Sequence, residues 1–491
     1  MRIISIDSMR ALEQSAVSSG IPEYRLMRRA GTGAAAIISR FAANRFRRVV
    51  FFCGSGNNAG DAIVCAGSLD LPHVLLPFRD LSLLKGAAAE AVVEFGPKLN
   101  IVSPDSFDFE PGDLLVDALL GIGFAGNSVR SPLDKAMAMM KHSRRNVVAF
   151  DLPSGLNGNT GEYLPETVPA VMTITFGAPK QGLFLKDAPA MCGKIEVVPI
   201  GVEPESVPQA LDHEYFCRQD AALLLKKHPL NSHKNSRGRV LVLCGSTTYP
   251  GAAVLASSAA LHFSGIVRLL TVKHSMCLPL PAALISRSLD PEKSGALPAD
   301  ALRSNRDFAE ASDVLCAGCG WGPDVSPELL ADVLNFPGTV VLDADALNLL
   351  SRTPELWKKR SDIILTPHPG EAARLAEVFK IPQGLSREKF AAALAQKLGA
   401  TVLLKGFHTC VSTPEGKTTI NGSGGPELAM AGSGDVLAGI IAALAASGHT
   451  PPAAARLGAF LHGMAGDMGR GTIIADKLPE LAAGAADLHI W

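Results

Sequence analysis

The stretch AMAGSGDVLAGIIAAL (429–444) places a glycine-rich turn directly before an apolar helical segment. The first turn of a helix has backbone N–H groups without partners in the helix, and the helix dipole adds positive potential there. The turn is therefore suited to bind a phosphoryl group during its transfer. Asp435 at its mouth could take a proton from an attacking hydroxyl. The alternative is that Asp435 only stabilises the N-terminus of the helix.

Elsewhere in the chain, short apolar runs that end in glycine or proline turns alternate with helical segments. Strands that alternate with helices predict a parallel sheet covered on both faces, and continuously apolar strands fit that burial. The runs are residues 47–56, 113–123, 146–155, 238–247, 265–272, 312–320, 339–348, 361–370 and 400–408. Helical segments lie at 83–96, 131–143 and 252–264. The predicted fold class is therefore α/β.

A break in this pattern at residues 197–215, which contain three prolines, indicates a linker. The 491 residues are also too many for one ordinary core, since domains usually have roughly 100–200 residues. We expect two three-layer αβα domains, residues 1–210 and residues 211–491.

The amino-acid composition of the chain limits which classes of binding partner are expected. The 46 Lys and Arg nearly balance the 47 Asp and Glu, so bulk attraction to nucleic acid or anionic membrane is not expected. Hydrophobic residues make up 47% of the chain and charged residues 19%, which excludes disorder and coiled coils. We therefore expect small-molecule substrates, with no nucleic acid and no membrane as partner. Sheets with apolar helices often self-associate, so a homo-oligomer is also expected.

The cysteines and the N-terminus predict a cytoplasmic protein. MRIISIDSMR has neither the apolar core nor the cleavage site of a leader, and VLAGIIAALAAS (436–447) is shorter than a membrane span of about 18 residues. Nine scattered cysteines suit free thiols in a reducing compartment. The CxxC pair Cys316 and Cys319 lacks a second pair at zinc-site spacing, so we interpret it as small residues in a tight turn.

Polar residues follow three of the predicted strands in the first half of the chain. GSGNNAGDA (54–62) can bring backbone amides and the Asn58 amide close to a phosphate. Asp117 is an acid inside an apolar run and needs a partner or a metal. Ser154 follows the third strand, and the oxygens of these three side chains would suit a hard cation such as a monovalent ion.

The segment GIGFAG (121–126) matches G-x-G-x-x-G after a strand. A dinucleotide fingerprint would have an acid about 20 residues later, where the chain has Lys141. An ordinary dehydrogenase is therefore disfavoured, whereas a phosphate or ribose cradle fits.

Together with LMRRAG (26–31), these segments resemble the N-terminal domain of the NAD(P)H-hydrate epimerases over roughly residues 1–205. The resemblance implies a Rossmann-like domain, with Asp151 as the acid/base that contacts the hydrated nicotinamide. It also implies K⁺ bound by Asn58, Asp117 and Ser154. The residues then expected to bind the hydrated cofactor are Asn57, Asn58, Ala59, Gly60, Asp61, Gly121, Ile122, Gly123, Phe124, Ala125, Gly126, Asn127 and Asp151.

The first motif departs from that family. The chain has GNNAGDA where the family usually has GNNGGDG. Ala59 and Ala62 therefore fit the family's site only if neither position needs a positive φ.

The second half lacks the G-x-x-x-x-G-K-[ST] segment of P-loop enzymes. It resembles instead the ADP- or ATP-dependent NAD(P)H-hydrate dehydratases, which are ribokinase-like, over roughly residues 215–490. The motifs occur in family order: HKNSRGRVLVLCGSTTYPGAAVLA (233–256), AGCGWGP (317–323), LDADALN (342–348), LTPHPGEAARL (365–375), LLKGFHT (403–409) and AMAGSGDVLAG (429–439). Cys319 stands where that family usually has a turn proline.

The resemblance implies Asp435 as the catalytic base of the second half. Contacts to the hydrated nucleotide are then expected from Ala252, Gly320, His368 and Asp435. The residues expected to hold the adenine nucleotide are Lys405, Gly406, Phe407, His408, Thr409 and Gly434. His368 could instead be a turn residue satisfied by the backbone, and we leave Asp343 and Asp345 outside the site as strand-end caps.

Both resemblances together imply a bifunctional repair enzyme. The first domain would interconvert the R and S forms of hydrated NADH or NADPH. The second would phosphorylate the S form with ADP or ATP, with Mg²⁺ on the nucleotide phosphates, and eliminate phosphate to regenerate the cofactor. One alternative is a ribokinase-like kinase for a hydroxymethyl heterocycle, with a non-catalytic nucleotide-binding N-terminal domain. Another is that the N-terminal domain is only a nucleotide-binding or RNA-associated scaffold, although the near-zero net charge and the 5% of aromatic residues disfavour RNA.

Overall fold

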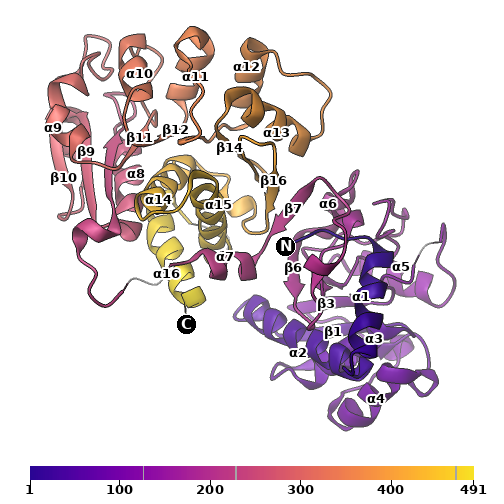
Figure 1. The fold of residues 1–491 in the computed structure, drawn as a ribbon. Helices are drawn as coiled ribbons and strands as arrows, with labels where there is room; N and C mark the ends of the chain where they lie inside the picture. Colours follow the sequence, from indigo (N-terminus) through magenta and orange to yellow (C-terminus); the bar gives the residue numbers. More distant parts are fainter. Residues whose placement is uncertain (125, 227–228, 470–472, 491) are drawn as a thin grey trace. The chain divides into compact units, whose positions relative to one another are not determined.

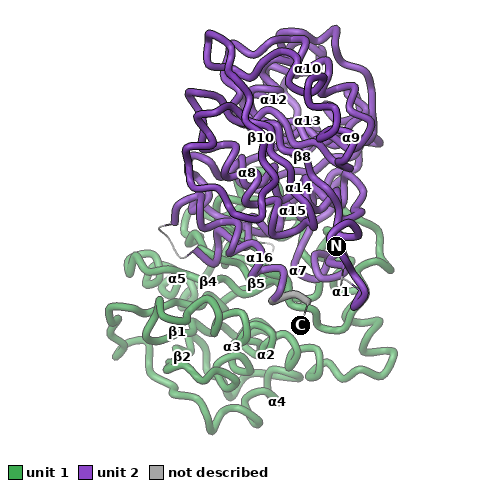
Figure 2. The backbone as a smooth tube through the Cα atoms, turned by 90° about the vertical axis from the view of Figure 1, so that its left-hand side faces the viewer, with its two compact units in different colours: residues 1–212 green, residues 213–491 purple. Residues whose placement is uncertain are grey.

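The structure, a computed structural model, describes residues 1–124, 126–226, 229–469 and 473–490. The chain divides into two compact units, unit 1 with residues Met1–Asp212 and unit 2 with residues His213–Trp491 (Figure 2). Each unit contains its own sheet, and Figure 1 labels the helices and strands. Both sheets are flanked by helices, which confirms the predicted α/β fold class.

Unit 1 is built on a six-stranded parallel sheet in the order β2-β1-β3-β4-β5-β6. The strands are β1 (Arg48–Cys53), β2 (His73–Pro77), β3 (Asp113–Ala118), β4 (Val147–Phe150), β5 (Met172–Phe176) and β6 (Lys194–Val198). The helices are α1 (Ile6–Ser18), α2 (Glu23–Ala42), α3 (Asn57–Gly67), α4 (Gly86–Phe95), α5 (Leu133–Ser143) and α6 (Ala188–Cys192).

Alternation along β1 produces the layers of unit 1. Val49 and Phe51 belong to a buried cluster with α2, α3 and α4, whereas Phe52 packs with Met137 and Met140 of α5 on the other face. The strand is apolar throughout because both of its faces are buried. After β1 the chain adds β2 on one side and β3 on the other, so the crevice between β1 and β3 is a topological switch point, where such sheets bind ligands.

Unit 2 contains a ten-stranded sheet in the order β10-β9-β8-β11-β12-β13-β14-β15-β16-β7, with antiparallel pairing on both sides of β15. The strands are β7 (His213–Phe216), β8 (Arg239–Leu243), β9 (Ile266–Val272), β10 (Ile285–Leu289), β11 (Val314–Ala317), β12 (Thr339–Leu342), β13 (Ile363–Leu365), β14 (Thr401–Leu404), β15 (Cys410–Ser412) and β16 (Thr418–Asn421). The helices are α7 (Arg218–Leu224), α8 (Pro250–Phe263), α9 (Arg306–Glu310), α10 (Pro327–Leu334), α11 (Asp345–Arg352), α12 (Pro369–Phe379), α13 (Arg387–Leu398), α14 (Ser433–Ala446), α15 (Pro451–Met468) and α16 (Leu478–Ile490).

The predicted linker at residues 197–215 needs a correction. Its last residues belong to β7, which pairs in parallel with β16 at the edge of the large sheet. Tyr215 and Phe216 are buried there. The sequence pattern does not predict this strand, because it has only four residues and follows a segment with three prolines.

The apolar stretch that opened the sequence analysis forms α14, and its residues from Val436 to Ala445 are buried. Small residues let α14 approach α8 closely, because a Cβ added to Gly439 would lie 2.2 Å from the carbonyl oxygen of Ala256. Among the described residues, no helix combines the length and apolarity that crossing a bilayer requires.

Candidate active sites

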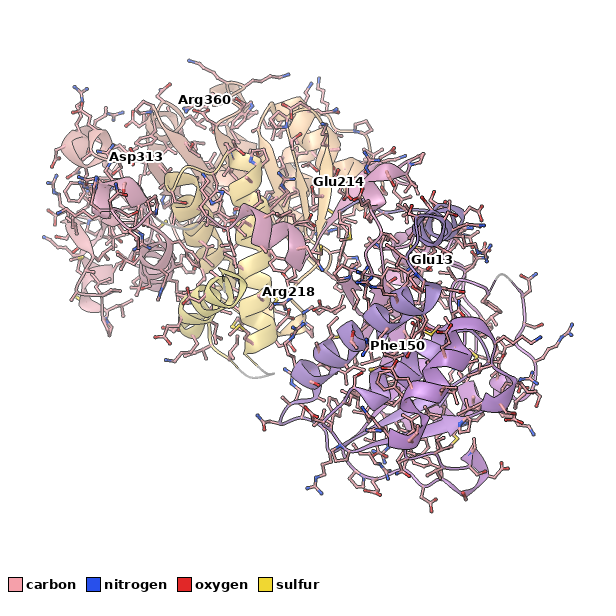
Figure 3. All side chains as sticks on the ribbon, turned by 60° about the horizontal axis from the view of Figure 1, so that its bottom comes forward. Glu13, Phe150, Glu214, Arg218, Asp313 and Arg360 are labelled. Atoms are coloured by element: carbon pink, nitrogen blue, oxygen red, sulfur yellow. The ribbon has the colours of Figure 1, made fainter. Side chains whose placement is uncertain are left out.

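Unit 1 has a cavity of about 980 Å³ at the switch point between β1 and β3. It is lined by α1, by the start of α3 and by the loop after β3. Glu13 of α1 and Phe150 at the end of β4 are labelled in Figure 3. The predicted residues that line this cavity are Asn57, Asn58, Asp61, Gly121, Ile122, Gly123, Phe124, Gly126 and Asp151.

The remaining predicted residues of this site lie elsewhere. Ala59 and Gly60 lie on the buried side of α3, where a Cβ on Gly60 would meet the sulfur of Met27 at 2.5 Å. Asn127 is exposed on the loop after β3, and Ala125 falls outside the described residues. Ala59 and Ala62 both lie within α3 in right-handed helical backbone, so the alanines of GNNAGDA do not distort the motif.

Asp151 is held by a lysine that the sequence analysis missed. Lys180 is 1% exposed, and its Nζ donates to Asp151 Oδ1 at 2.5 Å, to Thr175 Oγ1 at 3.0 Å and to the carbonyl of Phe176 at 2.7 Å. Asp151 has a φ of +63°, a left-handed conformation that is uncommon for residues other than glycine, although aspartate adopts it more often than most. Strained backbone and a buried ion pair at one cavity wall are typical of functional sites.

Two further acids of the cavity have perturbed protonation. Burial, aided by the Asp151 and Glu13 carboxylates, raises the pKa of Asp61 well above its ordinary value. Burial also raises the pKa of Glu13, although Lys180 opposes that shift. The cavity can therefore hold protonated acids close to the Asp151–Lys180 pair.

The three predicted metal ligands meet around Leu120. Asn58 Nδ2 donates to the Leu120 carbonyl at 2.9 Å, and Ser154 Oγ accepts from the Leu120 N–H at 3.0 Å. Ser154 Oγ in turn donates to Asp117 Oδ1 at 2.6 Å. Asn58 Oδ1 is buried without a hydrogen-bond partner in the described part of the chain. A buried oxygen left over in a set of oxygen donors fits a hard cation.

In unit 2, Asp435 lies in the first turn of α14 as the sequence predicted. Burial, with the nearby Asp343 carboxylate, raises the pKa of Asp435 to about 7. A Cβ on the neighbouring Gly434 would lie 3.3 Å from Lys405 Nζ and 3.5 Å from Asp343 Oδ2. The N-terminus of α14, the Asp343 carboxylate and the Lys405 ammonium therefore lie close together.

Asp343 belongs to this group, although the sequence analysis left it outside. It is 1% exposed, and its Oδ1 accepts from Lys405 Nζ at 2.6 Å. Burial works against the charge of Lys405, but Asp343 and Glu371 outweigh it and raise the pKa of the lysine. Asp345, by contrast, caps the turn after β11 through the N–H of Gly322, as predicted for a structural aspartate.

His368 caps α12. Its ring Nδ1 accepts a hydrogen bond from the N–H of Gly370 at 2.9 Å, and its backbone N–H donates to Glu371 Oε2 at 2.8 Å. This capping role agrees with the alternative that His368 is a turn residue satisfied by the backbone. The ring is nevertheless half-exposed, and Nε2 lies 3.2 Å from Glu371 Oε1. Burial raises the pKa of Glu371 to about 7.

The remaining predicted contact residues of unit 2 are Ala252, Gly320 and the segment from Lys405 to Thr409. Gly320 has a φ of +65°, and a Cβ there would meet the Cβ of Ala252 at 2.7 Å, so the two residues touch. The segment from Lys405 to Thr409 forms the loop between β14 and β15. In that loop the exposed Phe407 ring stacks on His408, with ring centroids 4.1 Å apart.

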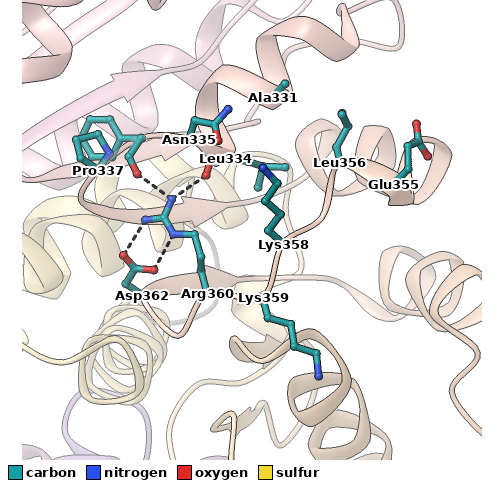
Figure 4. A pocket seen from close by; sticks show the side chains of 11 residues that line it. Ala331, Leu334, Asn335, Pro337, Glu355, Leu356, Lys358, Lys359, Arg360 and Asp362 are labelled. Atoms are coloured by element: carbon teal, nitrogen blue, oxygen red, sulfur yellow. Dashed lines mark hydrogen bonds and ion pairs between the residues drawn. The ribbon is translucent and has the colours of Figure 1, made fainter.

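Unit 2 has a cavity of about 770 Å³ near the amino ends of β12 and β13 (Figure 4). One of its charged side chains, Arg360, donates to Asp362 and to the carbonyls of Leu334, Phe336 and Gly338. These bonds tie the amino ends of β12 and β13 together, so the arginine is structural.

The chain matches two family models. Residues 23–182 match the YjeF-related protein N-terminus, and residues 240–481 match NAD(P)H-hydrate dehydratase. The chain is 34% identical to the bifunctional NAD(P)H-hydrate repair enzyme of Moorella thermoacetica, over 95% of this chain and 92% of the relative. It is 35% identical to that of Coxiella burnetii, over 96% and 97%.

The chain belongs to the bifunctional NAD(P)H-hydrate repair enzymes. The family includes a relative from Escherichia coli K12 that is 33% identical over 94% of this chain and 88% of the relative. A solved structure similar to unit 2 is an ADP/ATP-dependent NAD(P)H-hydrate dehydratase from Bacillus subtilis co-crystallised with ATP/Mg²⁺. It is 25% identical, with a TM-score of 0.45, and covers 57% of this chain and 100% of that one.

Proposed function

We propose that this chain repairs hydrated nicotinamide cofactors in two steps. Residues 1–210 would interconvert the R and S hydrates of NADH and NADPH. Residues 211–491 would transfer a phosphoryl group from ADP or ATP to the S hydrate and eliminate phosphate. The observation that carries the proposal is Asp435, a half-buried acid with a pKa near 7 at the N-terminus of α14.

The second step follows from what surrounds Asp435. Its carboxylate accepts the proton of the hydrate's hydroxyl as the oxygen attacks the terminal phosphorus. First-turn N–H groups of α14 and the Lys405 ammonium stabilise the charge of the transferring group. Phosphorylation converts a poor leaving group into a good one, so the ring double bond re-forms as phosphate departs. Mg²⁺ would arrive on the nucleotide phosphates and neutralise part of their charge.

For the first step, Asp151 is the acid/base of unit 1, and Lys180 positions its carboxylate through the 2.5 Å ion pair. The raised pKa of Asp61 makes it a proton donor on the same cavity wall. K⁺ would be held by Asn58, Asp117 and Ser154, where it would offset the buried charge of Asp117 and fix the loop after β3. The cytoplasmic location and the homo-oligomer stay predictions.

One coupled experiment tests both steps. The full chain receives the R hydrate of NADH with ADP, or separately with ATP, and NADH absorbance is followed. We expect recovery of NADH in the wild type. Asp435→Asn should abolish recovery from either epimer while R and S still interconvert by chromatography. Recovery in Asp435→Asn at the wild-type rate would remove the assignment of the base. Phosphorylation of a thiazole or pyrimidine alcohol in preference to the hydrate would favour the heterocycle kinase.

A further inference from the structure

Three cysteines of unit 2 converge beside Asp435. Cys244 directly follows β8, Cys316 lies in β11, and Cys319 lies in the turn after β11. All three are 0% exposed, and their Sγ atoms lie within 4.8 Å of one another. β8 and β11 are parallel neighbours in the sheet, so strand order brings Cys244 to a CxxC pair that lies 72 residues later.

The sequence pattern indicates small residues in a tight turn for the CxxC pair; in the structure Cys319 lies in that turn, whereas Cys316 lies in β11. Cys244 was not predicted to join the pair, because it follows a different strand and does not belong to a second CxxC. The thiols also lie at the switch point of the large sheet, where β8 has β9 on one side and β11 on the other. Ligands of open α/β sheets bind at such points.

The three Sγ atoms lie within 4.8 Å of one another, Cys244 Sγ lies 3.8 Å from the Cys316 carbonyl oxygen, and the Asp435 carboxylate lies beside Cys319. Burial alone would explain isolated cysteines, which behave as small apolar residues. It does not explain three sulfurs that converge, with a carboxylate beside one of them. A disulfide would use two of the sulfurs and leave the third without a role.

We propose that Cys244, Cys316, Cys319 and Asp435 form a binding site for a thiophilic divalent cation, with Zn²⁺ as the best match. Zn²⁺ binds cysteine sulfur and carboxylate oxygen with tetrahedral geometry, and its Zn–S bonds are about 2.3 Å long. Ligand sulfurs on such an ion are about 3.8 Å apart, so sulfurs at the 4.8 Å limit of the present cluster would move closer by about 1 Å. Asp435 is half-buried and touches Cys319, so it connects the sulfurs to the opening of the site.

Binding would release the thiol protons and take up the Asp435 carboxylate. Asp435 could then no longer accept the proton of the hydrate's hydroxyl, so Zn²⁺ would inhibit unit 2 and leave unit 1 active. This consequence for turnover rests on the proposed function, whereas binding of the ion does not.

The binding test uses the reduced, metal-free full chain and Co²⁺ as a spectroscopic probe. We expect a sulfur-to-cobalt charge-transfer band that saturates at one ion per chain and disappears when Zn²⁺ displaces Co²⁺. Cys319→Ser should weaken Zn²⁺ binding by roughly 100-fold or more, because the loss of a supporting group alone costs about 10- to 100-fold. The matched control, Cys277→Ser, removes an exposed thiol of the same unit and should leave the titration unchanged.

A second variant covers the case in which Cys319→Ser fails to fold. Asp435→Asn should keep the sulfur band but bind Zn²⁺ more weakly. The absence of the band in the wild type, or an equal loss of the band in Cys277→Ser, would overturn the site. A disulfide between two of the three cysteines that forms under mild oxidation, in a chain that binds no Co²⁺, would replace it with a redox pair.

The activity arm separates this site from the proposed function. Added Zn²⁺ should inhibit dehydration of the S hydrate, leave epimer exchange intact, and be reversed by a chelator. If the wild type gives the sulfur band but does not turn over the hydrate without zinc, the proposed function fails and the metal site stands. If Zn²⁺ binds at these cysteines and dehydration continues at full rate, Asp435 is not a ligand.

Discussion

At the scale of single residues, the two proposed catalytic acids have opposite surroundings. Asp151 is fixed by the Lys180 ammonium in a left-handed backbone conformation, whereas Asp435 lies near a second acid, Asp343, at a helix N-terminus. Asp435 therefore has a pKa near the pH at which it would work, as general acid–base catalysis favours. The two sites should respond differently to pH and to loss of charge.

The raised pKa of Asp435 predicts the acid side of the dehydration profile. Only the unprotonated carboxylate can accept a proton, so the rate should rise with pH, reach half its maximum near pH 7 and level off about one to two pH units above it. Steady-state rates with saturating S hydrate, measured across that range, check this. Glu371 also has a pKa of about 7, so Glu371→Gln is the control and should keep the rise. A rate that is flat from pH 5 to pH 8 would contradict the role of Asp435, since about 99% of it would be protonated at pH 5.

The buried pair in unit 1 predicts a stability pattern. Asp151→Asn should destabilise unit 1 by about 3–5 kcal/mol, because Lys180 keeps its buried charge without a counterion. The double variant Asp151→Asn, Lys180→Met removes both charges and should recover most of that loss, but not epimerase activity. Urea unfolding and epimer exchange measure the two properties. Equal stability of the single and double variants would argue against the ion pair.

At the scale of elements, α14 has two glycines with different functions. A Cβ on Gly434 would meet the flexible end of Lys405, whereas one on Gly439 would collide with the backbone of α8. Gly434→Ala should therefore lower kcat/KM of dehydration by about tenfold or more with little change in Tm. Gly439→Ala should lower stability by about 1–3 kcal/mol through overpacking. Thermal unfolding and steady-state kinetics of both variants separate the outcomes, and an unchanged Tm in Gly439→Ala would contradict the close packing of α14 on α8.

The cap of α12 provides a test of His368. His368→Asn can still cap the helix, whereas His368→Ala cannot and should cost about 1 kcal/mol. If the ring also contacts substrate, both variants should raise KM for the S hydrate. Normal kinetics with His368→Asn would leave only the capping role.

The elements show which features a sequence can predict. Apolar runs such as β8 and β11 are legible because both faces of each strand are buried. β7 was missed because a four-residue edge strand that follows a proline-containing segment has too little pattern. Lys180 and Asp343 were missed for another reason: a single polar residue after a strand gives no indication of its partner. Their pairings depend on the order of strands in the sheet, as does the meeting of Cys244 with the CxxC pair.

At the scale of the whole molecule, each unit has its own sheet and its own buried core. Fragments cut between Asp212 and His213 should therefore fold separately, one with epimerase activity and one with dehydratase activity. A second fragment that begins at Arg218 would lack β7 and the burial of Tyr215 and Phe216. It should be less stable than fragment 213–491 by about 3–6 kcal/mol, at about 1.5–3 kcal/mol for each aromatic side chain. Denaturant midpoints of the two fragments check this, and equal midpoints would contradict the contribution of β7.

The position of Trp321 has a practical consequence. Its indole is fully enclosed beside the Cys319 turn, and Nε1 donates to the carbonyl of Leu243 at 2.8 Å. The chain has only three tryptophans, and Trp357 is hydrogen-bonded to Leu398 at a different place in unit 2. The fluorescence of Trp321 should therefore change when a ligand binds in the active site of unit 2. Binding of nucleotide, hydrate or metal could then be followed in real time without an attached dye.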